Sequence, residues 1–264
     1  MDQSTGIKIN DTFSNGKYAL ISDITLSETW YTIPTFEGIL DGQEYKIYGL
    51  CIIQDSNGYC GLIGKNKGTI KNIKIYGGQI ITSNNVVYSL DVGLICGENK
   101  GTLYNITVRD SYIYVANGST DHDTESYVYA GVLCGSNWGT IEDCISKNNT
   151  LAAYSETQYK VAHVFGGGIV GMSLDGDIID VQSINNTLKV TARANFKHKF
   201  LIFGEEKHGS AYAYLGGVVG YYSLTTIRGE NKYENNTLYH YVERDCNCNT
   251  KIGGSKGDFS GGNN

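Results

Sequence analysis

Proline is nearly absent from this sequence of 264 residues, in which Pro34 is the only one. Long hydrophobic runs are missing as well, since no apolar stretch approaches the roughly 18 residues that a membrane-spanning helix needs. Basic charge is not in excess either: 21 Lys and Arg stand against 27 Asp and Glu, a formal net charge of −6. We therefore expect no membrane span, no nucleic-acid partner and, without a Gly-X-Y period, no collagen triple helix.

Several functional motifs are missing too. The seven cysteines lack the paired Cys-x-x-Cys spacing of a zinc site. The first 20 residues have no basic segment followed by an apolar one, so they do not predict a signal peptide. No metalloprotease, hydrolase-elbow or P-loop motif occurs. We expect no cofactor, and the pattern favours a protein that is not an enzyme.

Glycine and tyrosine are abundant instead, with 34 and 21 residues. Hydrophobic residues make up 41% of the chain and charged residues 18%, which is enough apolar material for a folded core. So many glycines would break long helices throughout the chain. The composition therefore predicts a glycine-punctuated β protein.

A repeat runs through the chain. Five segments share a Gly-Leu-Ile-Gly-like pattern, and their anchoring glycines are Gly64, Gly97, Gly135, Gly171 and Gly220. An earlier copy places Asp41 at the anchor, 23 residues before Gly64. A step of 23 is about one turn of a three-sided β-solenoid. The later steps of 33 to 49 residues then predict the same turn with loops or hairpins inserted at one corner.

Apolar residues recur at equivalent positions of these repeats, and stacked about 4.8 Å apart they would fill a narrow interior. The first column is Leu62, Ile95, Leu133, Ile169 and Val218. The second is Ile47, Ile70, Leu103, Ile141, Ile178 and Ile227, and the third is Leu50, Ile73, Ile106, Cys144 and Val181. Between the last two columns lie residues that tolerate the left-handed turn of a coil corner, namely Asn72, Asn105, Asp143 and Asp180. The alternative is an ordinary β-sandwich whose segments are similar by chance.

The motif Gly61-Leu-Ile-Gly-(x)3-Gly-Thr-Ile-Lys-Asn-Ile, with Leu20-Ile-Ser-Asp-Ile-Thr-Leu and Phe36-(x)4-Asp-Gly upstream, resembles the GLUG-repeat proteins. The resemblance extends from about residue 18 to about residue 228. It implies an all-β fold, a right-handed parallel β-helix. It also implies a place in bacterial surface proteins, adhesins or the non-catalytic parts of IgA-cleaving peptidases.

The last repeat departs from this pattern, because Thr225 stands where the motif has glycine and Glu230 falls in a core column. We therefore expect the helix to end near residue 228. The predicted organisation is an N-terminal cap and first coil over 1–35, and coils over 36–228. A C-terminal cap or docking segment with a Gly-rich tail follows over 229–264.

The inserted segments are rich in aromatic residues, and insertions at one corner would gather into one lateral wall. Loops on a rigid scaffold are favoured places for binding sites, and tyrosine is common at interfaces. The tyrosines expected to bind a glycan or a protein partner are Tyr112, Tyr114, Tyr127, Tyr129, Tyr154, Tyr159, Tyr212 and Tyr214. The alternative is that these alternating aromatics pack on neighbouring coils.

Acidic loop residues and sequons are further candidate sites. Asp121, Asp123 and Glu125 lie close together with His122 and could bind a divalent cation, although such a run is more often a solvated loop tip. Six Asn-x-Ser/Thr triplets permit glycosylation, at Asn10, Asn105, Asn117, Asn148, Asn185 and Asn235.

Cys96 and Cys134 occupy equivalent positions in adjacent repeats, which would place their Cα atoms about 5 Å apart. That separation permits a disulfide, but stacked thiols are also a common apolar filling. We expect both to be reduced.

The expected function is a non-catalytic structural or adhesive module, extracellular or at the cell surface, that binds a glycan or protein partner through the aromatic wall. Two alternatives stay open. The chain could be a subunit of a filament, because open strand edges recruit further chains. It could also be a polysaccharide-active enzyme whose loop carboxylates lie about 5–10 Å apart in a cleft.

Overall fold

The protein is a parallel β-helix, seen here in a computed structural model that describes residues 15–53, 58–84, 88–119, 124–158, 160–194, 210–244 and 250–253. Every strand pairing among these residues is parallel, and the strands form four sheets, which we call A, B, C and D. The predicted β-helix is confirmed. No helix among the described residues is long and apolar enough to cross a membrane.

Sheets C and A carry the repeated motif. Sheet C consists of β3 (Ile33–Phe36), β8 (Ile63–Asn66), β12 (Cys96–Asn99), β16 (Cys134–Asn137), β21 (Val170–Leu174) and β26 (Val219–Ser223). The first half of sheet A is β1 (Lys17–Ala19), β4 (Ile39–Asp41), β9 (Thr69–Tyr76), β13 (Thr102–Arg109), β17 (Thr140–Glu142), β22 (Asp177–Ile179) and β27 (Thr226–Arg228). Its second half contains the ends of β9 and β13 together with β2 (Ile24–Thr25), β5 (Lys46–Tyr48), β18 (Ile145–Lys147), β23 (Gln182–Ile184) and β28 (Lys232–Glu234).

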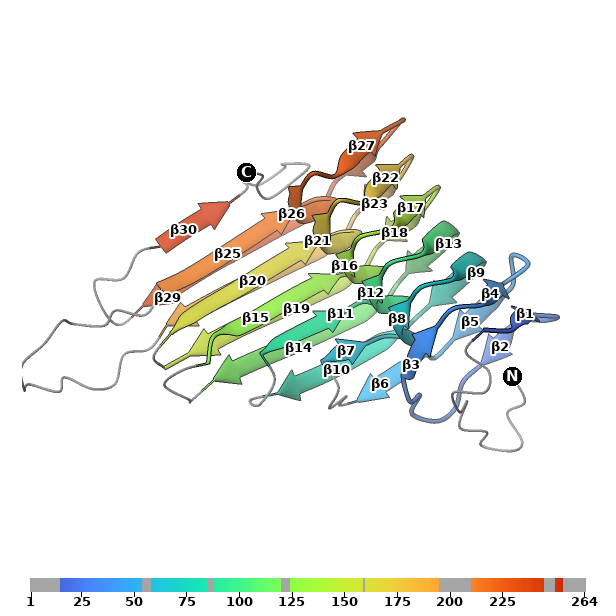
Figure 1. Cartoon of the computed structure of the whole chain (residues 1–264), viewed down its shortest axis with the longest axis horizontal. Helices are drawn as coiled ribbons and strands as arrows, with labels where there is room; N and C mark the ends of the chain where they lie inside the picture. The colour runs from blue at the N-terminus through green and yellow to red at the C-terminus, as the bar shows by residue number, and fades with distance from the viewer. Residues whose placement is uncertain are drawn as a thin grey trace, which may run out of the picture.

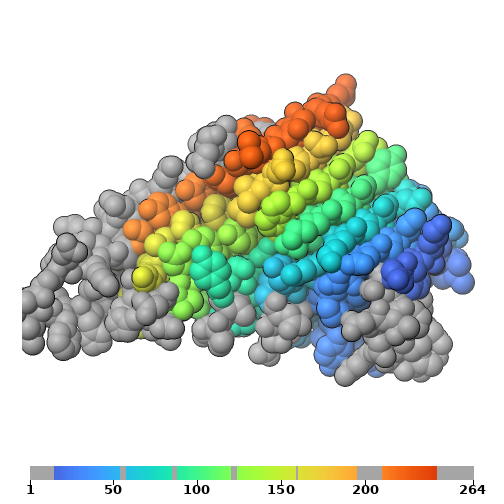
Figure 2. Space-filling view, viewed as in Figure 1, coloured from blue at the N-terminus to red at the C-terminus, as the bar shows by residue number. Residues whose placement is uncertain are grey.

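Sheets B and D lie beside them. Sheet B is β6 (Cys51–Ile53), β10 (Gln79–Asn84), β14 (Tyr112–Ser119), β19 (Thr150–Thr157), β24 (Thr187–Ala194) and β29 (Thr237–Arg244). Sheet D is β7 (Tyr59–Cys60), β11 (Ser89–Val92), β15 (Ser126–Gly131), β20 (Val161–Gly167), β25 (Ser210–Gly216) and β30 (Thr250–Gly253). Each coil passes through sheets C, A, B and D in that order, and successive coils stack from the N-terminal to the C-terminal end (Figures 1 and 2).

The predicted columns form the core. In the first column all five side chains are fully buried, and from Ile95 to Val218 the backbones are joined from coil to coil by hydrogen bonds of 2.9–3.0 Å. In the other two columns the members from Ile70 and Ile73 onward are aligned as predicted. The first members were wrong, because Leu40 pairs with Ile70 while Ile47 pairs with Ile75.

The first step of the repeat is therefore longer than predicted. Thr35 pairs with Lys65 and Leu40 with Ile70, so this step is 30 residues rather than 23, and Pro34, not Asp41, is equivalent to Gly64. The coils are also not three-sided units with loops added. The residues expected in insertions build sheets B and D, whose long strands lie toward the left of Figure 1.

Sheets B and D pack face to face, since alternate residues of their strands are buried between them. Small apolar residues such as Val115, Ala130 and Ala153 fill most of this interface. Farther from the coil core the filling is polar: Ser155 donates hydrogen bonds of 2.8 Å and 2.9 Å to the carbonyl and hydroxyl oxygens of Ser126. Sheets B and D thus form a thin lateral extension of the coil.

The helix continues past the predicted boundary at residue 228. Strand β28 pairs with β23, and β29 pairs with β24 over its whole length, so residues 232–244 belong to a further coil. The prediction was wrong because it followed the Gly-Leu-Ile-Gly pattern. These strands follow the second half of sheet A and sheet B, where that pattern does not occur.

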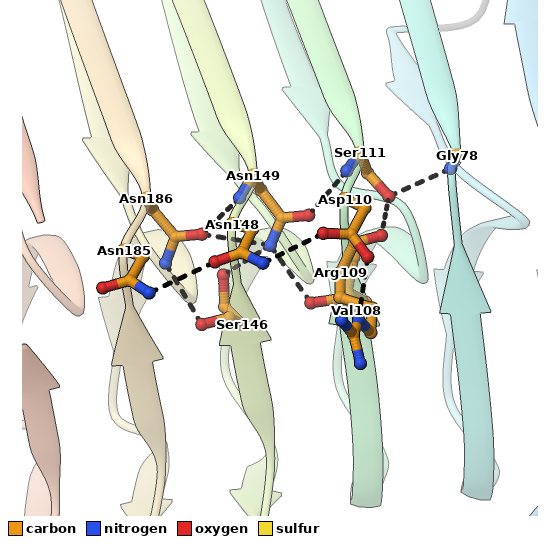
Figure 3. Close-up of polar contacts among 10 residues, drawn as sticks. All are labelled: Gly78, Val108, Arg109, Asp110, Ser111, Ser146, Asn148, Asn149, Asn185 and Asn186. Atoms are coloured by element: carbon orange, nitrogen blue, oxygen red, sulfur yellow. Dashed lines mark hydrogen bonds and ion pairs between the residues drawn. The ribbon is translucent and has the colours of Figure 1, made fainter.

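Asparagine ladders stabilise the corners between the sheets. The four predicted corner residues of sheet A adopt a positive φ of 51–54°. Figure 3 shows two more rows at the next corner. In the outer row, Asn148 donates a hydrogen bond of 3.0 Å to Asp110, and Asn185 donates one of 3.3 Å to Asn148. The inner row contains the buried Asn149 and Asn186, which are also hydrogen-bonded to each other. Each coil therefore satisfies polar groups of the next one.

Cys96 and Cys134 are free thiols whose sulfur atoms lie 3.7 Å apart in the core. Burial raises the pKa of the Cys134 thiol well above its ordinary value, so it is poorly reactive when folded. We expect neither to react with iodoacetamide in the native protein and both to react after denaturation without reductant. Mass spectrometry of the peptides checks this, and labelling that needs reductant would contradict it.

Candidate functional site

The tyrosines predicted to form one wall lie on two opposite faces. Strand β14 buries Ile113 and Val115 against sheet D, so Tyr112 and Tyr114 point outward from sheet B, as does Tyr154 from β19. Sheet D buries its alternate residues against sheet B in the same way. Its outward tyrosines therefore lie on the other side of the lateral extension: Tyr127, Tyr129, Tyr212 and Tyr214.

On sheet D the rings stack on one another. The ring of His163 lies between those of Tyr127 and Tyr212, with centroid distances of 4.5 Å and 4.8 Å. A second row places Phe165 between Tyr129 and Tyr214, at 5.1 Å and 4.9 Å. The planes within these four contacts differ by 3–18°. Each ring therefore covers the face of the next.

This stacking limits what the face of sheet D can bind. A ligand that stacks on a ring needs an uncovered ring face, and inside these rows only edges and hydroxyl groups are left. Burial also lowers the pKa of His163 to about 4, so this imidazole is neutral at physiological pH. The packing alternative considered from the sequence thus describes this half of the wall.

Sheet D also meets sheet C at a close angle. A Cβ atom on Gly135 would lie 2.4 Å from the backbone nitrogen of Val92, and one on Gly171 would lie 2.5 Å from that of Ala130. The repeated glycine is required by this approach of two backbones. The buried carboxylate of Asp91 lies where sheets C and D meet, and it accepts a hydrogen bond from Ser136. Burial raises the pKa of Asp91 to about 7.

The rings on the outer face of sheet B do not form the parallel stacks seen on sheet D. Tyr154 lies between Ala116 and Thr191 on the adjacent strands, which are too small to cover an aromatic ring. Tyr112 is 39% exposed and Tyr241 46% exposed. Tyr114 approaches Tyr154 at a tilt of 42°, with centroids 5.5 Å apart. Ring surface is therefore available for stacking on this side of the molecule.

A hollow of ≈ 260 Å³ opens on the same face. It is lined by Tyr154, Ser155, Glu156, Thr191 and Arg193. Thr191 pairs with Tyr154 on one side and with Tyr241 on the other, so the two rings flank β24 about 10 Å apart, two strand spacings. We call these lining residues, together with Tyr241 and Lys189, the sheet B site.

Lys189 reaches between the two rings. Its Nζ is 5.6 Å from the ring centroid of Tyr154 and 5.2 Å from that of Tyr241. Arg193 is four residues farther along β24 on the same face, about 13 Å away for an extended strand, and it is in register with Glu156 on one side and Glu243 on the other. The sheet B site thus combines two aromatic rings with an ammonium group between them.

The other candidate sites are distributed as follows. Asp121, Asp123, Tyr159 and Asn10 lie outside the described residues. Glu125 accepts hydrogen bonds from Tyr127 (2.6 Å) and Tyr88 (3.4 Å). Within the described part of the chain no three His, Cys, Asp or Glu side chains are grouped as metal ligands.

The sequons lie mostly in the corner ladders. Asn117 is buried, which leaves no space for a glycan on its side chain. Asn105 donates a hydrogen bond of 2.8 Å to Asn72. The side-chain nitrogens of the exposed Asn148 and Asn185 donate hydrogen bonds within their ladder. Asn235 is exposed on the last coil. Corner geometry therefore accounts for asparagine at most of these positions.

Sequence reasoning missed Lys189, Thr191, Arg193 and Tyr241. Their signal was the alternation of outward residues in Leu188–Ala194 and Leu238–Val242, which matches that of Leu151–Thr157. It also missed the buried ladder of Asn66, Asn99 and Asn137, whose amides are joined by bonds of 2.8 Å. Identical asparagines two residues after the first three anchoring glycines could have indicated that ladder.

Comparison of the chain with protein-family models, with curated proteins and with solved structures gives no match in any of the three.

Proposed function

We propose that this protein is a non-catalytic adhesive module, extracellular or at the cell surface, that binds a glycan at the sheet B site. The observation that carries the proposal is the pair of rings of Tyr154 and Tyr241, which flank Thr191 beside a hollow. The C–H groups of a sugar ring pack on an aromatic face, while its hydroxyl groups exchange hydrogen bonds with polar residues at the rim.

The rigid scaffold supports this role. The strands of sheet B are held in register over up to eight residues, so Tyr154, Thr191 and Tyr241 are fixed relative to one another before a ligand arrives. Preorganised rings lose little conformational freedom on binding. Repetition along the sheet also suits a polymer, because Tyr112 and Tyr114 extend the aromatic surface toward earlier coils.

The described carboxylates do not favour an enzyme. Of the loop carboxylates considered for catalysis, Asp121 and Asp123 lie outside the described residues, and Glu125 accepts hydrogen bonds from Tyr127 and Tyr88. Asp91 and Glu98, where sheets C and D meet, are both nearly fully buried, and Glu98 is paired with Lys100 at 3.1 Å. A general acid or nucleophile must reach its substrate. A binding module is therefore the function that this geometry favours, and the resemblance of the repeats to GLUG-repeat proteins, which implies a place in surface proteins or adhesins, points the same way.

The Tyr154→Ala and Tyr241→Ala variants are each expected to weaken glycan binding about tenfold, a little more than 1 kcal/mol for one stacked ring. Glycan arrays identify a ligand for the wild type, and isothermal titration calorimetry measures the loss. Tyr127→Ala on sheet D is the matched control and is expected to retain affinity.

Two outcomes would contradict the proposal. An equal loss of glycan affinity in the Tyr127→Ala variant would mean either that the glycan binds on the sheet D face or that the variants are unstable. Circular dichroism would distinguish these two explanations. Turnover of a polysaccharide by the wild type would support an enzyme instead.

A further inference from the structure

The two cations that the structure describes on the outer face of sheet B have different neighbours. Arg193 is in register with Glu156 on one adjacent strand and with Glu243 on the other. Lys189 is in register with Ala152 and Tyr239, so neither position beside it in the ladder is a carboxylate. Lys189 is therefore the cation of this face on which a ligand can act.

Lys189 is held without an anionic partner among the described residues. Its ammonium contacts the faces of Tyr154 and Tyr241, at 5.6 Å and 5.2 Å from their centroids. Other lysines on the coil pair with carboxylates: Lys74 with Glu44 at 2.8 Å and Lys67 with Glu37 at 2.9 Å. A cation placed over two rings keeps its charge available, because ring contacts neutralise none of it.

This position fits an anionic group on a stacked sugar. A sugar packed on the exposed surface of Tyr241, which is 46% exposed, would lie beside the ammonium of Lys189. A carboxylate or sulfate there would form charge-assisted hydrogen bonds of about 2.7–2.9 Å. Arg193, about 13 Å along the strand, would lie near a later unit of the same chain.

We propose that the ligand of the sheet B site is an acidic polysaccharide, bound by Tyr154 and Tyr241 with its anionic group on Lys189. This inference rests on the proposed glycan-binding function, and it adds the charge of the ligand. It also predicts that affinity decreases as salt concentration rises, because an exposed ion pair is screened.

The test measures binding of three polymers of similar length, a polyuronate, a sulfated polysaccharide and a neutral glucan, to wild type and to Lys189→Met and Lys189→Arg. Methionine keeps an apolar side chain over the rings but removes the charge. We expect Lys189→Met to bind the preferred acidic polymer about tenfold more weakly, Lys189→Arg to retain its affinity, and the neutral glucan to be unaffected. The polyuronate and sulfate arms show which anion is preferred.

The outcomes separate the two proposals. A wild type that prefers the neutral glucan, or a Lys189→Met variant that binds acidic polymers as wild type does, overturns the acidic ligand but leaves glycan binding intact if Tyr154→Ala still weakens it. Equal loss for acidic and neutral polymers in Lys189→Met shows that Lys189 only orients the rings, which also overturns it. Binding of none of the three polymers counts against the glycan function itself.

Discussion

Replacing Ile106 by Asp is expected to lower the free energy of unfolding by about 4 kcal/mol or more. Ile106 is 0% exposed and lies in the column between Ile73 and Cys144 on the adjacent coils. A carboxylate there would meet only apolar neighbours within its column, and an unpaired buried charge is among the most costly changes in a core. Urea unfolding followed by circular dichroism measures the loss.

The neighbouring residue gives a matched control. Thr107 is half-buried on the outer face of the same strand, and it pairs in register with Lys74 on one side. Thr107→Asp introduces the same charge where water and a cation are close, so its effect is expected to stay within about 0.5 kcal/mol. Similar losses in both variants would contradict the inward position of Ile106.

The sequence predicted sheets A and C well because their contacts repeat. A side chain in these sheets contacts its equivalents one coil away, so the same residue types recur, as Leu62, Ile95 and Leu133 do. The outward positions of sheets B and D follow no such rule. Tyr114, Ala152 and Lys189 are equivalent yet dissimilar, since an outward side chain does not have to fill a core. These strands were therefore interpreted as insertions.

A related cause explains why the tyrosines predicted to form one wall lie on two opposite faces. Alternation correctly places Tyr112 with Tyr114, and Tyr127 with Tyr129, on one side of their own strands. It cannot tell that the chain turns back between β14 and β15, which makes the outer faces of the two strands point in opposite directions. Only the packing of sheet B on sheet D settles which tyrosines share a surface.

The error in the first repeat step arose from two extra residues at a corner. Leu40 and Lys46 are six residues apart, but their partners Ile70 and Lys74 are four apart. Gln43 and Glu44 occupy this wider turn with positive φ values of 48° and 64°. An alignment without gaps could not include them, so Ile47 was assigned to the wrong column.

Asp91 had no sequence signal at all, because its equivalents in later coils are the aromatic Tyr129 and Phe165. Asp91 is nevertheless expected to have a large effect on the pH dependence of stability. Its carboxylate is 4% exposed and accepts a hydrogen bond from Ser136, with Glu98 and Lys65 as the charged groups that act on it. Burial disfavours the ionised form and raises its pKa from 3.8 to about 7.

The Asp91→Asn variant is expected to be more stable than wild type at pH 8 by about 4 kcal/mol, which is the shift of about three pKa units at 1.36 kcal/mol each. The native state holds this proton up to about pH 7, whereas the unfolded chain loses it near pH 4. The contribution of Asp91 to stability is thus fully present below pH 4 and is lost as the pH rises toward 7. Asparagine resembles the protonated acid at every pH.

The difference between the two proteins should therefore grow with pH, from near zero at pH 3.5 to its full size above pH 7. Urea unfolding at pH 3.5, 5.5 and 8 measures it, and Asp143→Asn at an exposed corner controls for the substitution itself. A constant difference between Asp91→Asn and wild type would show that the amide acts through packing rather than through the proton. If the variant were less stable than wild type at pH 8, the ionised carboxylate would stabilise the junction of sheets C and D. Lys65 would then be the cation that interacts with it.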